Sequence, residues 1–238
     1  MLFFFVACAS SDEPGDIVTE QQTLAILVAQ SAFEIDTVIA CASGSSNSNE
    51  IVVYVYPRAN ATALKYFETE DASVDENDYN AYTEVTLPAE DFFNGYLKTF
   101  TRETEVERWV IISFRESGKL HLSGPIRLKH ISQNTVFSSA VTIDQSILGS
   151  PVFSWSTLAS AQNAIYFQVV SNGMNDLLSG TYTTETDFQY YEVDNVVLNI
   201  TTETPPDLSL GNEYGFTLMG VSEDNWVNDL VQIPFVAN

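Results

Sequence analysis

Apolar and polar residues alternate along most of this chain. Glu50–Tyr56 is rich in β-branched and aromatic residues and is followed by a proline. Tyr214, Phe216 and Leu218 occupy every second position after a turn that carries Gly211. A period of two is typical of a half-buried strand. No stretch has a convincing period of 3.6, so the pattern predicts an all-β chain.

The remaining segments of this kind are short and separated by turn-rich stretches, as in a β-sandwich. The expected strands are 33–42, 63–70, 83–87, 96–102, 107–115, 119–130, 151–155, 165–170, 177–184, 196–200 and 231–235. The apolar run 23–29 is too short to classify, 134–150 is interpreted as a connection, and 222–229 as a polar loop.

Charge divides the chain into two parts. All nine lysines and arginines lie before residue 130, and the remainder carries twelve acids and no base. The 238 residues, 45 % of them hydrophobic, are enough for one large core or for two cores of roughly 100 residues each. We therefore expect a domain boundary near residue 131.

The second part resembles a known domain family. Leu208, a turn with Gly211, and Tyr214 before alternating apolar residues are similar to the E–F corner and F strand of fibronectin type III domains. In that family the tyrosine hydroxyl bonds back to the corner backbone. Pro151–Trp155 resembles the B strand, with Phe153 and Trp155 on one face. The resemblance implies an antiparallel β-sandwich.

The first part resembles the same family less closely. The segment 107–130 is similar to the F and G strands, but Trp109 stands where the family usually has tyrosine. The expected fold is all-β: two tandem antiparallel β-sandwiches, a divergent one over 31–130 and a fibronectin-III-like one over 131–238.

The N-terminus resembles another class of protein. Residues 1–8 form a short apolar run ending in Ala-Cys, similar to the end of a bacterial lipoprotein signal peptide. The resemblance implies cleavage before Cys8 and a lipid on that residue. The Ser/acid cluster in the tether 9–30 resembles the surface-export signal of Bacteroidota lipoproteins, which implies an outer-membrane protein exposed at the cell surface. An ordinary flexible tether is the alternative for this cluster, and surface display is favoured. An unprocessed apolar N-terminus is the alternative, and whether Met1 is the true start stays open.

Composition limits the partners. There are 32 acids and 9 bases, a net charge of −23. Nucleic-acid affinity rests on cations that neutralise phosphates, so a nucleic-acid partner is not expected. Cationic partners suit this charge. The two cysteines, Cys8 and Cys41, lie in separate contexts, and we expect Cys41 to be a small buried hydrophobe rather than a reactive thiol.

No catalytic arrangement is indicated. The only histidines, His121 and His130, fall in one strand-like segment among cations. Alternation places them on a solvated or inter-domain face, away from any serine that they could activate. Carboxylates are abundant, but no motif singles out a pair for glycoside hydrolysis. We therefore expect no enzyme, with a glycan-active hydrolase as the least favoured alternative.

Two acidic loops offer the hard oxygen ligands that calcium prefers. The first contains Asp75 and Asp78, and the second contains Glu223, Asp224 and Asp229. Neither has the EF-hand spacing. Calcium binding and ordinary polar loops on an acidic protein are both open, and the second interpretation is favoured. No other cofactor is indicated.

Aromatic residues near loops are the remaining candidates for ligand contact. Trp226 in the second acidic loop is similar to the sugar-stacking or partner-anchoring aromatics of sandwich binding modules. The alternative is that it folds back onto the sandwich edge. Tyr190 and Tyr191 form a weaker aromatic pair.

These observations predict a non-catalytic, lipid-anchored cell-surface protein that binds a glycan or a protein through loops at the sandwich ends. The alternative is a structural or accessory subunit of an outer-membrane assembly for transport or secretion.

Overall fold

The computed structural model describes residues 22–46, 49–138, 140–156 and 162–238, and confirms the all-β prediction. The described helical elements are the short helix α1 (Leu24–Ala29) and one 3-10 turn, η1 (Tyr79–Ala81). No helix in the described part of the chain has the length and apolar character that a membrane span requires. The Cys8 prediction lies outside the described residues.

The first strand set, β1–β9, forms one continuous sheet. Its strands are β1 (Phe33–Gly44), β2 (Glu50–Tyr56), β3 (Thr62–Glu68), β4 (Thr83–Val85), β5 (Glu90–Phe92), β6 (Leu97–Glu103), β7 (Trp109–Glu116), β8 (Lys119–Ser123) and β9 (Ile126–Arg127). The sheet folds into two facing layers, and β1 belongs to both of them. Its start pairs with β8 in parallel, and its end pairs with β2 in antiparallel orientation. Apolar residues from both layers, such as Val53, Phe100 and Ile112, meet in one core.

The second strand set, β10–β18, forms two sheets. The six-stranded sheet has the order β10 (Val136–Ser138), β18 (Val227–Val236), β17 (Glu213–Val221), β13 (Ile165–Asn172), β14 (Leu177–Thr183) and β16 (Val196–Asn199). The three-stranded sheet has the order β11 (Val141–Asp144), β12 (Val152–Trp155) and β15 (Asp187–Gln189). Phe153 of β12 stacks on Phe216 of β17, with ring centroids 3.9 Å apart. The two sheets therefore enclose a core, as in a sandwich.

The unclassified run 23–29 is the helix α1. Thr23 caps its start, since its Oγ1 accepts a hydrogen bond from Ile26 N at 3.4 Å. Leu24 and Leu27 are buried and belong to a cluster that includes Leu122 of β8. The helix thus covers the outer face of the sheet that contains β7 and β8.

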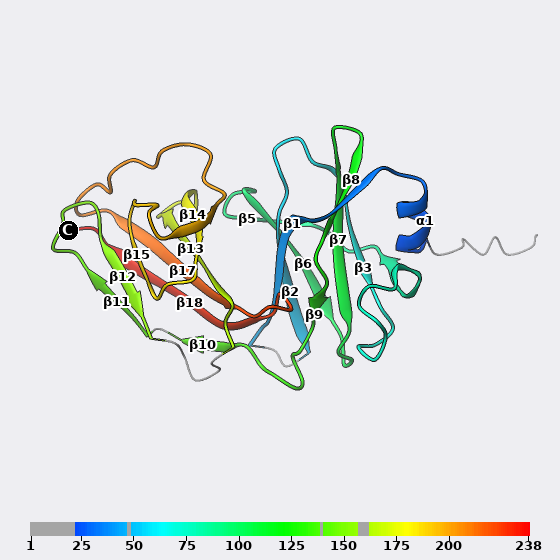
Figure 1. Ribbon diagram of the computed structural model, residues 1–238. Helices are drawn as coiled ribbons and strands as arrows, with labels where there is room; N and C mark the ends of the chain where they lie inside the picture. The colour runs from blue at the N-terminus through cyan, green and yellow to red at the C-terminus, as the bar shows by residue number, and fades with distance from the viewer. Residues whose placement is uncertain (1–21, 47–48, 139, 157–161) are drawn as a thin grey trace, which may run out of the picture.

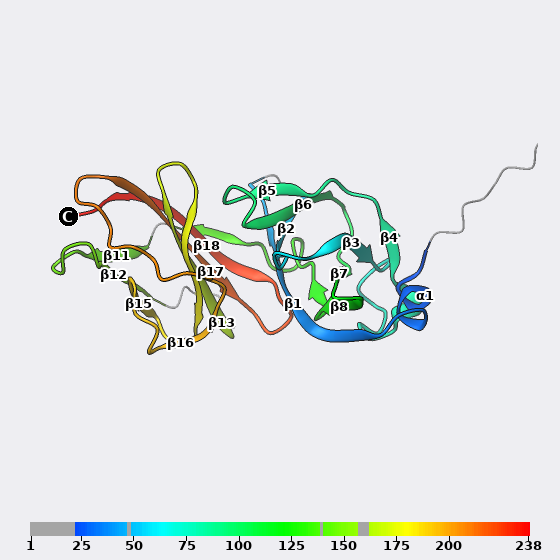
Figure 2. The same ribbon diagram turned by 90° about the horizontal axis from the view of Figure 1, so that it is seen from above.

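A third apolar cluster joins the two strand sets. Cys41 and Leu97 of the first set contact a group that includes Phe167, Met219 and Leu230 of the second. Both views place the sets side by side, with α1 at one end of the molecule and the C-terminus at the other (Figures 1 and 2). Among the described residues, the only pairing between sets is one isolated bridge, from Ala42 to residue 226.

Candidate functional site

The β17–β18 loop crosses from the second strand set into the first. Trp226 is fully buried and belongs to the first set's core, beside Val38 and Ala42. The neighbouring backbone is fixed as well, because Ala42 N donates to Asn225 O at 3.0 Å. The expectation of a loop-tip contact at Trp226 is therefore wrong. The residue does fold back, but onto the other strand set, where burying its indole removes a large apolar surface from water.

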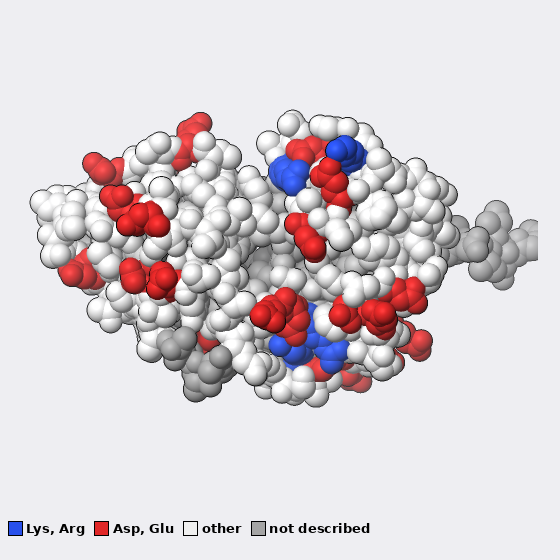
Figure 3. All heavy atoms as spheres, in the orientation of Figure 1, with Lys and Arg blue, Asp and Glu red and all other residues white. Residues whose placement is uncertain are grey.

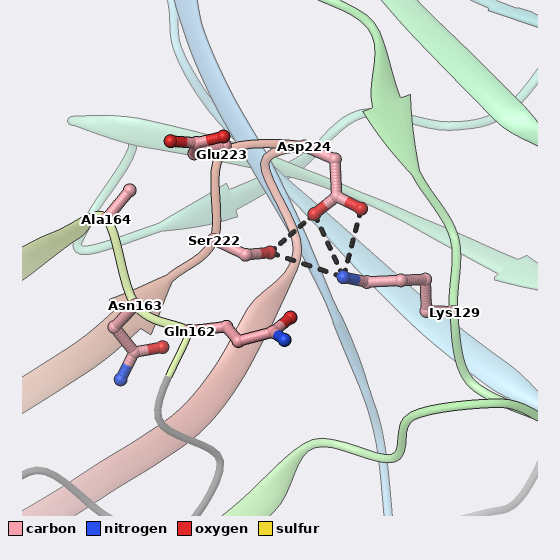
Figure 4. A pocket seen from close by; sticks show the side chains of 7 residues that line it. All are labelled: Lys129, Gln162, Asn163, Ala164, Ser222, Glu223 and Asp224. Atoms are coloured by element: carbon pink, nitrogen blue, oxygen red, sulfur yellow. Dashed lines mark hydrogen bonds and ion pairs between the residues drawn. The ribbon is translucent and has the colours of Figure 1, made fainter.

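The same loop borders a cavity of about 480 Å³ (Figure 4). Lys129 Nζ lies 2.9 Å from Asp224 Oδ2, and Ser222 Oγ donates to Asp224 Oδ1 at 2.5 Å. Glu223 points away from this ion pair (Figure 4). Lys129 and Asp224 neutralise each other, so the cluster acts as a latch between the strand sets. Lys129, from the part of the chain that holds all the basic residues, thus contacts the acidic second part.

The proposed calcium residues are not brought together. Asp224 is paired with a lysine, and Asp229 is buried and accepts from Asn163 Nδ2 at 2.9 Å. Asp75 and Asp78 accept backbone N–H bonds within their own turns, at 2.9 and 3.0 Å. Within the described ranges, no three His, Cys, Asp or Glu side chains gather where they could hold a metal ion. These carboxylates order their loops instead.

The tyrosine pair is also largely withdrawn from the surface. Tyr190 is buried, and its hydroxyl donates to Pro206 O at 2.7 Å. Tyr191 is half-buried, and its hydroxyl accepts from Asn199 Nδ2 at 2.6 Å. The expectation that Tyr190 contacts a ligand is wrong, because its ring is part of the second set's core.

Both histidines are buried, which corrects the expected solvated face. Alternation placed His121 outward because Leu120 and Leu122 were assigned to the core. In the structure α1 covers those leucines, so both faces of β8 are buried. His121 Nδ1 lies 3.0 Å from Thr37 Oγ1, and its ring lies 5.3 Å from that of Phe114.

Another concave surface is a furrow between the strand sets. Its larger cavity, of about 490 Å³, is lined by Asp36, Thr37, Ile39, Tyr56, Arg58, Leu198, Asn199, Ile200, Thr201 and Thr202. An adjoining cavity of about 250 Å³ shares three of these residues and adds Val38, Ala40, Cys41, Gly124, Ile165, Tyr182, Val221 and Asn225. We call the two together the junction furrow. Figure 3 shows the surface hollowed between the strand sets.

Asp36 is placed in the furrow by a β-bulge. The register of β1 against β8 shifts between Glu34 and Val38, and Asp36 has a left-handed φ of 55°. Bulges re-aim side chains, and aspartate tolerates this backbone conformation. Gly124 leaves the necessary space, since a Cβ there would lie 2.9 Å from Asp36 Oδ1.

The other charge in the furrow is already paired. Arg58 Nη1 lies 2.7 Å from Glu116 Oε2, and Arg58 Nη2 donates to Thr37 O at 2.7 Å. In contrast, the Asp36 carboxylate makes no hydrogen bond or ion pair with any residue that the structure describes. The furrow therefore combines a free negative charge with apolar walls.

Aromatic residues hold one wall of the furrow in place. Tyr56 stacks on Tyr96 with centroids 5.8 Å apart, and Tyr96 Oη donates to Ile200 O at 2.6 Å. Burial raises the pKa of Tyr56, so its hydroxyl stays protonated. The sequence indicated none of this, because the furrow joins residues more than 140 positions apart.

Cys41, at the floor of the smaller cavity, is buried and free, as predicted. Burial raises the pKa of its thiol to about 12, which keeps it neutral and unreactive.

No family model matches the chain, and no curated protein matches its sequence.

Proposed function

We propose that this protein is a non-catalytic, lipid-anchored cell-surface binding protein and that the junction furrow is its contact site. The observation that carries the proposal is a concave, partly apolar surface between two strand sets that share an apolar cluster, with one carboxylate that has no partner among the described residues. Pockets of this size with a few polar groups are typical ligand sites. The furrow replaces the loop-tip site that the sequence suggested.

The surroundings of the histidines support a non-catalytic role. His121 contacts Thr37, and His130 Nε2 lies 3.0 Å from the backbone oxygen of Thr104. Both rings are buried, so neither is placed as a general base for a nucleophile at the surface.

The proposed domain organisation is a tandem pair of β-sandwiches, of which the second is fibronectin-III-like. Two features favour this. The Tyr214 hydroxyl accepts a hydrogen bond from Ser209 N at 2.9 Å, the contact of the family's corner. The strand ladders also separate into residues before and after the region of 131, where the basic residues end.

Anchoring through Cys8 would place the α1 end toward the membrane and the C-terminal end away from it (Figure 1). The test is the intact mass of the native protein from detergent-solubilised outer membranes, with a pull-down in the same sample. A diacylated chain that starts at Cys8 is expected. An unmodified chain that starts at Met1 would remove the anchor from the proposal.

A structural or accessory subunit of an outer-membrane assembly is the second candidate, favoured by an apolar tip at the C-terminal end. Ile147, Leu148, Leu210 and Val236 are 45 to 70 % exposed there. Backbone bonds lock the turns that carry them, such as Gly211 N to Ala237 O at 2.8 Å. Contiguous exposed apolar residues mark interaction surfaces. Lysine at Leu148 should then prevent co-purification of a stoichiometric membrane partner.

A further inference from the structure

We propose that the junction furrow binds an extended peptide segment of a partner protein, with a lysine or arginine side chain paired to Asp36. This deepens the proposed function and rests on it, because it names the class of ligand for the same site. Three features carry the inference: the free carboxylate, the apolar walls and an open strand edge beside them.

The carboxylate selects for a cation. Asp36 is exposed and unpaired within the described residues, while the furrow's arginine is held by Glu116 and a backbone oxygen. Eight of the nine basic side chains form ion pairs with acids of the same chain. The 32 acids outnumber the 9 bases, so the chain has a net charge of −23, and Figure 3 shows no basic side chain on its view of the second strand set. A cationic segment is attracted by this field and an anionic one is repelled.

The walls select for a long aliphatic stem beside that charge. Ile39 and Leu198 line both cavities, and Val38, Ile165 and Val221 continue the smaller one. Lysine and arginine bury their methylene stems on apolar surface while the head group stays polar. A neighbouring apolar residue of the peptide would fill the smaller cavity.

The open strand edge favours an extended chain over a free amine. β16 is the last strand of the six-stranded sheet, so one of its edges is unpaired among the described strands. Val197 and Leu198 on it are 60 and 42 % exposed. An unpaired edge offers backbone N–H and C=O groups to another chain, and pockets beside it read alternate side chains.

The test is fluorescence anisotropy of the full chain with a labelled octapeptide of alternating valine and lysine. We expect binding that weakens as salt rises. Asp36→Asn should reduce the affinity about fivefold, since one partly exposed ion pair is lost. Gly124→Ala, which crowds Asp36 Oδ1, should reduce it as well. Glu213→Gln, an equal change of charge at an exposed site outside the furrow, should leave the affinity unchanged.

Several results would overturn the inference. An equal loss in Glu213→Gln would mean diffuse attraction to an acidic surface. Equal affinity for an octapeptide of valine and glutamate would remove the role of Asp36. Spermine that binds as tightly as the lysine peptide would assign the site to a free polyamine, and maltohexaose that displaces the peptide would assign it to a glycan. Loss of this inference alone would leave a Cys8-anchored protein with a partner at another surface, which the membrane pull-down detects.

Discussion

Trp226 shows how one side chain can join the two strand sets. It follows β17 in sequence, yet its ring lies among Val38, Ala42 and other residues of the first strand set. Its buried indole N–H has no hydrogen-bond partner in the described structure, so its contribution to stability comes from packing. Trp226, which the sequence suggested as a ligand contact, is a buried core residue that holds the two strand sets together.

Replacing Trp226 with alanine should lower the free energy of unfolding by about 3–5 kcal/mol, because it leaves a large cavity in a closed core. Urea unfolding followed by circular dichroism measures the change. Leu148→Ala is the control, since Leu148 is 70 % exposed and its replacement should cost less than about 0.5 kcal/mol. A loss at Trp226 no larger than the control would contradict its burial.

Cys41 links burial to pH. Burial raises the pKa of the folded thiol to about 12, against the ordinary 9.0 of a thiol in water, so the folded state holds its proton over a range where the unfolded state loses it. Stability must therefore fall as pH rises above 9.0. As the pH rises from about 8 to about 10, ionisation of the unfolded Cys41 thiol should lower the free energy of unfolding by about 1 kcal/mol.

The measurement is the urea midpoint at both pH values for the protein and for Cys41→Ala, which should lack this part of the pH dependence. In a Cys8→Ser background, a thiol-reactive disulfide should modify Cys41 only after unfolding. Rapid modification of the native protein would show that the thiol is not buried.

Among the structural elements, the turn before β17 depends most clearly on residues close together in sequence. Leu208 is buried, Gly211 takes a φ of 81°, and the Tyr214 hydroxyl accepts from Ser209 N. The glycine turn and the hydroxyl contact need only residues within seven positions of one another, whereas the burial of Leu208 also depends on distant residues of its core cluster, such as Phe153. The sequence motif therefore predicted the contact that the structure contains.

Tyr214→Phe should destabilise the protein by about 1 kcal/mol, because Ser209 N–H loses its acceptor. Hydrogen exchange of the Ser209 amide should become faster. Tyr166→Phe is a matched control, since the Tyr166 hydroxyl is buried without a partner in the described structure and its removal should not destabilise. Equal costs for the two changes would mean that the corner bond contributes nothing.

Elements differ in how far their sequence predicts them. β2 has the predicted bounds because seven strongly strand-forming residues lie before a proline. β10, β11 and β15, which were not expected, have only three or four residues each, too few for a period to show. The predicted polar loop 222–229 is too long, since β18 begins at Val227. The polar residues Asn228 and Asp229 suggested a loop, but both are buried in the strand.

At the scale of the molecule, the cluster around Cys41, Phe167 and Met219 makes the two strand sets interdependent. Large apolar contacts of this kind resist relative motion of the parts that they join. The Lys129–Asp224 ion pair and the buried Trp226 side chain also connect the two strand sets.

We therefore expect the protein to unfold in one cooperative transition. Scanning calorimetry should give equal calorimetric and van't Hoff enthalpies. Trp226→Ala should shift this one transition to lower temperature. Two separated transitions, with only one of them moved by the substitution, would show that the strand sets fold independently.

The sequence by itself determined the all-β character, most strands and the corner turn, because these depend on alternation and on contacts between near neighbours. It also determined the burial of Cys41, which its apolar neighbours indicate. Only the tertiary structure decided the position of Trp226, the burial of His121 and the existence of the junction furrow. Each depends on which face of a strand is covered by an element distant in sequence. Periodicity shows that a face is apolar, but the covering element is chosen by the packing of the whole chain.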